Sequence, residues 1–199
     1  MRYYTGFFAF LLFALFSQAA YAHNIESEFA GFYEGFIHPI TGIDHLLVMI
    51  SVGLWASQKD KKIIRVLPGL FVACLLLGFW IGTQQTPTPI VEMMIALSVV
   101  ILGLLLSKSH IHTVFSCFLI NLFAIFHGHA HGTEFSNTAQ WLEYGLGLIL
   151  TTSLLYGTGL VIGFVVNHSS STVKFKIFQL GGLAVAITGG VLLQALEIN

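Results

Sequence analysis

The chain alternates long apolar stretches with short polar segments. Six stretches are each about as long as a membrane-spanning helix, which needs about 20 predominantly apolar residues. We expect these spans near residues 38–57, 63–82, 89–107, 111–131, 138–166 and 173–196. The polar segments between them are short, so neighbouring helices should pack antiparallel. The pattern predicts an all-α polytopic membrane protein, in which residues 23–199 form one domain, a six-transmembrane-helix bundle.

The residues before the first span have the features of a targeting segment. Arg2 supplies a positive charge, Gly6 to Phe16 form a short apolar region, and Ala20-Tyr21-Ala22 matches a small-residue cleavage site. This predicts a cleavable signal peptide over residues 1–22, with His23 as the mature N-terminus outside the cytoplasm. A retained seventh helix is the alternative.

Composition supports the membrane assignment. The chain is 56% hydrophobic and 9% charged, whereas a soluble domain has about 25% charged residues. The lipid bilayer is therefore an expected partner, and a net charge of −1 gives no reason to expect a nucleic-acid partner. Cys74 and Cys117 each lie in an apolar stretch, which is typical of small buried side chains rather than a disulfide or a metal motif.

Charge placement predicts the direction of the helices. After the signal peptide, every basic residue lies in alternate connections. They are Lys59, Lys61, Lys62, Arg65, Lys108, Lys174 and Lys176. Basic connections remain on the cytoplasmic side, so both termini should be periplasmic and the protein should be a multi-pass protein of a bacterial inner membrane. Acidic residues other than Asp60 fall on the outer side. Either they attract cations from outside, or they are the polar residues that remain available in loops without basic residues.

The fourth predicted span ends in a cluster of histidines. His127, His131 and Glu134 follow the spacing i, i+4, i+7, so they share one helical face. Two imidazoles one turn apart can chelate an ion, and a carboxylate one turn further can join or orient them. His129 points roughly away and is a weaker candidate; alternatively, it faces a water-filled vestibule as an entry ligand. A single buried histidine is often structural, but this density of histidines favours a metal site.

The first predicted span begins with a second cluster. Pro39 suits the first turn of a helix, because it lacks the N–H that would have no partner there. His38 would then precede the helix, with Asp44 and His45 about two turns inside. A carboxylate at that depth needs a partner or an ion. Met49 shares a face with His45 and is a second-tier candidate, since methionine in a membrane helix is more often a packing residue.

Both clusters fall at the same outer depth, so the first and fourth helices are predicted to face each other and complete one site. Three other residues are second-tier candidates. The free amine and imidazole of His23 could chelate a metal. Glu92 and Glu143 could be carboxylates at the rim of the site, although each is also a favourable charge at a helix N-terminus.

The residues around both clusters resemble the motifs of the HupE/UreJ family. The first motif is His38-Pro-x-x-Gly42-x-Asp44-His45, followed by Met49 and Val52-Gly53-Leu54-Trp55-Ala56. The second is Phe126-His127-Gly128-x-Ala130-His131-Gly132-x-Glu134, with His129 at a variable position. The leader, His23, the six spans and the length also fit, so the resemblance covers essentially the whole chain. It implies nickel uptake, often alongside hydrogenase or urease assembly. It also implies metal-handling roles for His38, Asp44, His45, His127, His131 and Glu134.

We therefore expect a secondary transporter or facilitator that takes up a divalent transition metal from the periplasm into the cytoplasm. The resemblance favours Ni²⁺, whereas imidazole and carboxylate ligands also suit Co²⁺, Zn²⁺ and copper. No Walker motif is present, so this chain should not use ATP directly. No prosthetic group is expected, because the metal is the cargo. A functional link to a nickel enzyme is expected, and homo-oligomerisation is left open.

Two other functions fit the same residues. One is an intramembrane zinc-type metalloenzyme, a hydrolase with Asp44 or Glu134 as general base, although no HExxH pattern occurs. The other is a metal sensor or delivery protein that binds without transport. A polar path that continues to the inner face would favour the transporter, and a closed pocket would favour the enzyme.

Overall fold

The computed structural model describes residues 30–108, 111–135 and 140–198. The fold is that of the compact unit Gly31–Asn199. The predicted signal peptide (residues 1–22) and His23 lie outside the described residues. In the described part all regular secondary structure is helical, as predicted.

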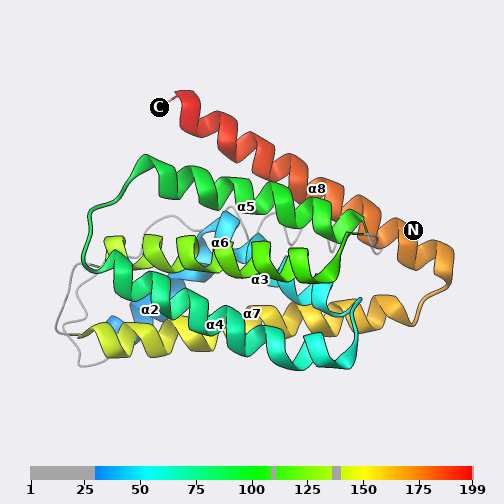
Figure 1. Cartoon of the computed structure of the whole chain (residues 1–199), viewed down its shortest axis with the longest axis horizontal. Coiled ribbons are helices and arrows are strands. Elements are labelled where there is room, and N and C mark those ends of the chain that lie inside the picture. Colours follow the sequence, from blue (N-terminus) through cyan, green and yellow to red (C-terminus); the bar gives the residue numbers. More distant parts are fainter. Residues whose placement is uncertain (1–29, 109–110, 136–139, 199) are drawn as a thin grey trace, which may run out of the picture. The chain divides into compact units, whose positions relative to one another are not determined.

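The helices of the described part follow the predicted spans closely (Figure 1). They are α2 (Ala30–Thr41), α3 (Ile43–Ala56), α4 (Lys61–Gly82), α5 (Pro89–Ser107), α6 (Thr113–Glu134), α7 (Trp141–Asn167) and α8 (Ser171–Ile198). The five from α4 to α8 are each long and apolar enough to cross a membrane. The number rises to six if the bent pair α2–α3 counts as one span.

The first predicted span differs from the expected continuous helix. Pro39 lies inside α2 rather than in the first turn of a helix, and the chain bends by 80° between α2 and α3. Proline has no N–H to donate, so the helix loses the bond to the carbonyl of Gly35 and is weakened there. His38 therefore lies in the last turn of α2, and Asp44 lies in the first turn of α3 rather than two turns inside a helix.

Glycines bring α4 and α6 into close contact. A Cβ on Gly78 would overlap the carbonyl of Ile125, and a Cβ on Gly82 would overlap the carbonyl of His129. Both contacts advance in the same direction along the two helices, so α4 and α6 run parallel. Small residues at membrane-helix interfaces permit this close backbone approach. The C-terminal half of α6, which carries the second histidine cluster, is thereby fixed against α4.

The bent pair α2–α3 packs in the same way along α7. Thr151 of α7 donates its hydroxyl to the carbonyl of Phe36 at 2.6 Å, and a Cβ on Gly159 would overlap the carbonyl of Ile50. The chain from Phe36 to Ile50 is longer than the stretch of α7 from Thr151 to Gly159. The extra residues form the break, which turns the first histidine cluster toward the interior, where His45 is buried.

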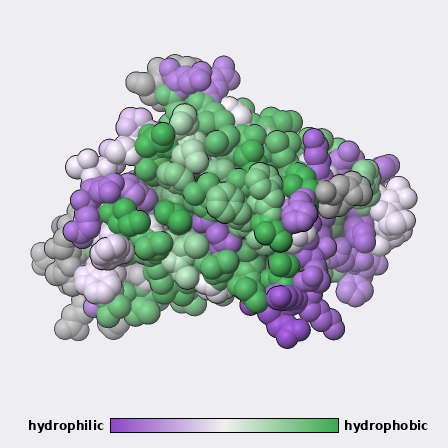
Figure 2. Space-filling view, in the orientation of Figure 1, coloured by the Kyte–Doolittle hydropathy of each residue, from purple (hydrophilic) through white to green (hydrophobic). Residues whose placement is uncertain are grey.

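The surface supports a membrane location. Figure 2 shows an apolar band that covers the middle of the molecule, with hydrophilic residues gathered toward its two ends. Large apolar side chains are widely exposed, including Trp80, Phe118 and Ile187. Soluble monomers rarely expose contiguous apolar surface on this scale, so these side chains are expected to face lipid.

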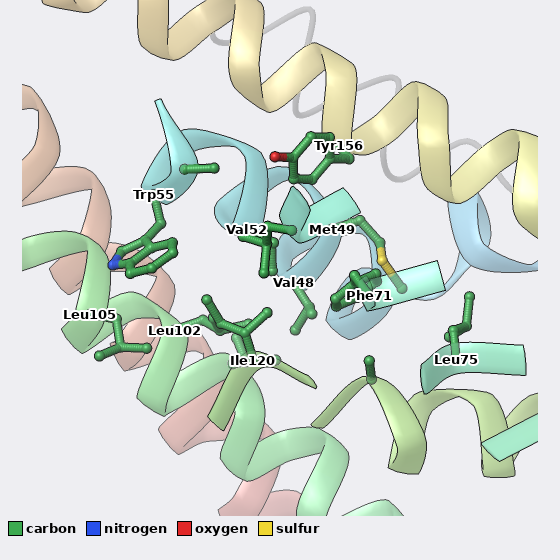
Figure 3. Close-up of a cluster of buried hydrophobic side chains, with 14 of the residues drawn as sticks. Val48, Met49, Val52, Trp55, Phe71, Leu75, Leu102, Leu105, Ile120 and Tyr156 are labelled. Carbon is green, nitrogen blue, oxygen red and sulfur yellow. The ribbon is translucent and has the colours of Figure 1, made fainter. Parts of the chain in front are cut away.

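The buried core lies between α3, α4, α5, α6 and α7. Figure 3 shows Met49 pointing into this core together with Val52 and Phe71, and all three are fully or almost fully buried. This environment favours a packing role for Met49 over metal binding.

Candidate metal-binding site

The break between α2 and α3 and the C-terminal end of α6 bring the two histidine clusters together. The ring centroids of His38 and His131 are 5.0 Å apart. The ring of His45 lies 4.7 Å from that of His127 and 4.6 Å from that of His131. Four imidazoles from three helices therefore form one group, with His45 and His131 at its centre.

The outer edge of this group is accessible. His38 Nε2 lies 2.8 Å from Glu134 Oε2, and the two side chains are 40% and 51% exposed. One ligand atom from each of His38, His131 and Glu134 lies within 4.8 Å of the other two. Imidazole and carboxylate donors at such spacing can bind a borderline divalent cation. We call these three residues the outer subsite.

The inner part of the group consists of three buried imidazoles, those of His45, His127 and His131, which we call the buried subsite. Each has its Nδ1 atom near a polar oxygen. His45 Nδ1 lies 2.8 Å from Asp44 Oδ1, and His127 Nδ1 lies 3.0 Å from the carbonyl oxygen of Phe123. His131 Nδ1 lies 3.4 Å from the hydroxyl of Tyr144.

The opposite nitrogen of each of these rings has no partner. Nε2 of His45, His127 and His131 is buried and makes no hydrogen bond within the described part of the chain. A buried polar atom left without a partner costs about 1–3 kcal/mol. A hydrogen bond at Nδ1 also fixes which nitrogen carries the proton and leaves Nε2 free to bind a metal. The three Nε2 atoms are therefore available to bind a cation.

Backbone dipoles favour a cation at the same place. His38 lies in the last turn of α2, and His131 and Glu134 lie in the last turn of α6. The C-terminal end of a helix carries partial negative charge from carbonyls that lack helical partners. Two such ends near the outer subsite attract positive charge. Broken helices whose ends face the substrate are a recurring feature of transporter sites.

The second-tier candidates lie apart from this group. His129 Nε2 is 2.9 Å from Gln85 Oε1, so its ring faces the segment after α4. Glu92 is exposed in the first turn of α5, and Glu143 is half-buried in the first turn of α7. Neither glutamate takes part in the hydrogen bonds or ring contacts that join the four imidazoles. His23 lies outside the described residues.

Sequence reasoning did not identify Tyr144 as part of the site. Its ring stacks on Phe79 of α4 with centroids 5.4 Å apart, and it contacts Phe135 at 4.7 Å. The one available signal was its position near the start of the fifth span, at the same predicted depth as the clusters. An aromatic residue there is unremarkable, because aromatic side chains are common near both membrane interfaces.

The chain is similar to known proteins over most of its length. The sequence profile of the family described as HupE / UreJ protein matches residues 11–192. Protein HupE of Rhizobium leguminosarum bv. viciae is 33% identical over 175 residues, which are 87% of this chain and 90% of that protein. No solved structure matches the chain. The likeness first seen in two short motifs thus extends across all the described helices that carry the site.

Proposed function

Because the chain belongs to the HupE/UreJ family, we propose that it carries Ni²⁺ across the bacterial inner membrane, from the periplasm into the cytoplasm. The family consists of membrane proteins of the transporter type rather than enzymes, which removes the metalloenzyme alternative. A metal-uptake role follows from that membership, and the choice of nickel is our proposal.

The strongest support for a cation as cargo comes from one observation. Three imidazoles, those of His45, His127 and His131, are buried in a membrane protein with Nε2 unpartnered. Polar groups in the bilayer are costly and mark substrate or ion pathways. A cation bound through these atoms removes the cost and gives the cluster a function.

The two subsites suggest an order of events. A hydrated cation first meets the exposed pair His38 and Glu134, whose carboxylate attracts it and replaces part of its water shell. His131 belongs to both subsites, so it transfers the cation inward to His45 and His127. Binding at each step has to remain weak enough for release.

Asp44 acts in this scheme through His45. Its Oδ1 accepts a hydrogen bond from the backbone N–H of His45 and lies equally close to Nδ1 of the same ring, both at 2.8 Å. A carboxylate behind a ligating imidazole fixes the ring and strengthens it as a donor. We therefore assign Asp44 an orienting role rather than direct metal binding.

Buried polar groups continue from the site toward the inner face. Asn121 lies on α6 before His127, and its Oδ1 has no partner. Thr152 and Tyr156 lie on α7 beyond Tyr144, and their hydroxyls are likewise buried and unpartnered. Such groups can bind water or a partly hydrated cation on its way through. This arrangement supports transport over a closed binding pocket.

Uptake by the purified protein in liposomes tests this proposal. We expect wild-type protein to accelerate accumulation of Ni²⁺, measured with a metal-quenched dye inside the vesicles. His131→Ala should lower the initial rate at least tenfold, because both subsites lose a ligand. His168→Ala is the matched control, since His168 is exposed at the C-terminal end of α7, and should transport normally.

Competition with Co²⁺, Zn²⁺ and copper in the same assay measures which metal the protein transports best. The general order of metal affinities does not predict this selectivity. Wild-type vesicles that accumulate no more Ni²⁺ than protein-free vesicles would refute the transport proposal. If the same protein binds Ni²⁺ tightly in detergent, the sensor or delivery function takes its place.

A further inference from the structure

Tyr144 lies where three structural elements of the site meet. Its side chain is 4% exposed. Its ring is stacked almost parallel to Phe79 of α4, at an interplanar angle of 6°, and contacts Phe135 just after α6. Its backbone carbonyl packs against Gly35 of α2, where a Cβ would overlap it. The position of the phenol is therefore fixed from three sides.

The hydroxyl of this fixed ring faces a proposed ligand. Tyr144 Oη lies 3.4 Å from Nδ1 of His131, and His131 Nε2 is buried on the other side of the imidazole without a partner. A buried phenol normally finds a hydrogen-bond partner, and the imidazole nitrogen is the partner that the structure supplies.

The other two buried imidazoles provide a comparison. His45 has a carboxylate behind its Nδ1, and His127 has a backbone carbonyl. In all three rings an oxygen lies on the Nδ1 side and the free nitrogen is Nε2. Tyr144 occupies for His131 the place that Asp44 occupies for His45.

We propose that Tyr144 is a positioning residue for metal binding, which accepts a hydrogen bond from Nδ1–H of His131 and thereby keeps Nε2 available for the cation. The inference rests on the proposed function, because it assumes that His131 binds the transported metal. Neither family motif quoted above includes this residue.

The chemistry of the partner has a consequence for transport. A carboxylate increases the electron density of an imidazole ligand more than a neutral phenol does. His131 is therefore a weaker donor than His45. His131 is also shared by the outer and buried subsites, so in the proposed pathway it has to exchange the cation most readily. A neutral partner suits that task.

Two measurements on Tyr144→Phe test the role. The substitution keeps the ring that stacks on Phe79 and removes only the hydroxyl. Affinity for Ni²⁺, measured by calorimetry on the purified protein, should fall about 10- to 100-fold, the usual effect of losing a partner of a metal ligand. Tyr33→Phe is the matched control, because it removes the same hydroxyl from a tyrosine of α2 that is 59% exposed and belongs to neither subsite. It should leave the affinity unchanged.

The second measurement needs no metal and does not respond to a purely structural role. Nitrogen-15 NMR of the histidine rings, with His131 assigned from the His131→Asn spectrum, reports which nitrogen carries the proton. In the wild-type protein Nδ1 should be protonated and Nε2 should not. Tyr144→Phe should shift the Nδ1 resonance of His131, whereas Tyr33→Phe should not.

A wild-type His131 protonated at Nε2 would overturn the inference, even if Tyr144→Phe does not fold. Wild-type affinity in Tyr144→Phe would also overturn it, while the transport proposal would stand as long as wild-type vesicles take up Ni²⁺. Wild-type vesicles without uptake would instead refute the proposed function, and the NMR result would still decide the hydrogen bond.

Discussion

At the residue scale, the motifs identified the chemistry but not the role of each side chain. The spacing of His127, His131 and Glu134 predicted one shared face of α6, and the structure brings His131 and Glu134 together beside His38. The spacing did not separate residues that can bind a cation from those that orient them. Asp44 contacts His45, its neighbour in sequence, and Tyr144 contacts His131 from another helix. The second contact depends on how α6 and α7 pack, which residue spacing does not encode.

Asp44→Asn tests the orienting role at this scale. The amide keeps the size of the side chain and one oxygen to accept from His45, but it loses the negative charge. We expect Ni²⁺ affinity to fall about 10- to 100-fold rather than disappear, as measured by calorimetry. Asp60→Asn is the control, because it removes the same charge at a different place. Asp60 caps the N-terminus of α4, at the predicted inner end of that helix. Complete loss of binding, as severe as in His45→Ala, would make Asp44 a ligand instead.

At the element scale, apolar length predicted α4 to α8 well and the first span only in part. Hydrophobicity does not distinguish a straight helix from a broken one, and Pro39 is compatible with either the start or the interior of a helix. Here the interior position is stabilised by tertiary contacts, since Gly35 and Thr151 hold α2 against α7. Those contacts join residues far apart in the sequence, so local propensity could not reveal them.

Gly78→Ala tests the close packing of α4 on α6. The added methyl group would overlap the carbonyl of Ile125, and overpacking of this kind typically costs about 1–3 kcal/mol. We expect a lower thermal unfolding temperature in detergent. Gly69→Ala on the same helix is the control, because its methyl group meets open space. Since alanine favours a helix by up to about 1 kcal/mol over glycine, Gly69→Ala should be neutral or stabilising. Equal unfolding temperatures for the two variants would contradict the predicted overlap.

At the scale of the whole molecule, the pattern of basic residues predicts how the bundle lies in the membrane. The site lies at the end of α6 away from the basic connections, which places it on the periplasmic side if those connections are cytoplasmic. The direction of proposed transport depends on this orientation. The helices themselves are compatible with either direction, so the prediction rests on charge placement alone.

Cysteine labelling at the two ends of α4 tests the orientation. In a background with Cys74 and Cys117 replaced by alanine, Gln84→Cys should react with a membrane-impermeant maleimide added to spheroplasts. Lys61→Cys should react only after the membrane is opened. Both positions are exposed in the structure, so access depends on the side of the membrane. The reverse labelling pattern would place the outer subsite in the cytoplasm and make export the expected direction.

The most direct test of the account is the location of bound nickel. In crystals grown with Ni²⁺, anomalous scattering at the nickel absorption edge should give a peak close to the imidazole cluster. The peak should lie about 2.0–2.2 Å, a typical metal–ligand distance, from at least two Nε2 atoms among those of His38, His45, His127 and His131. A peak elsewhere, or no peak at these imidazoles when nickel is bound in solution, would contradict the account.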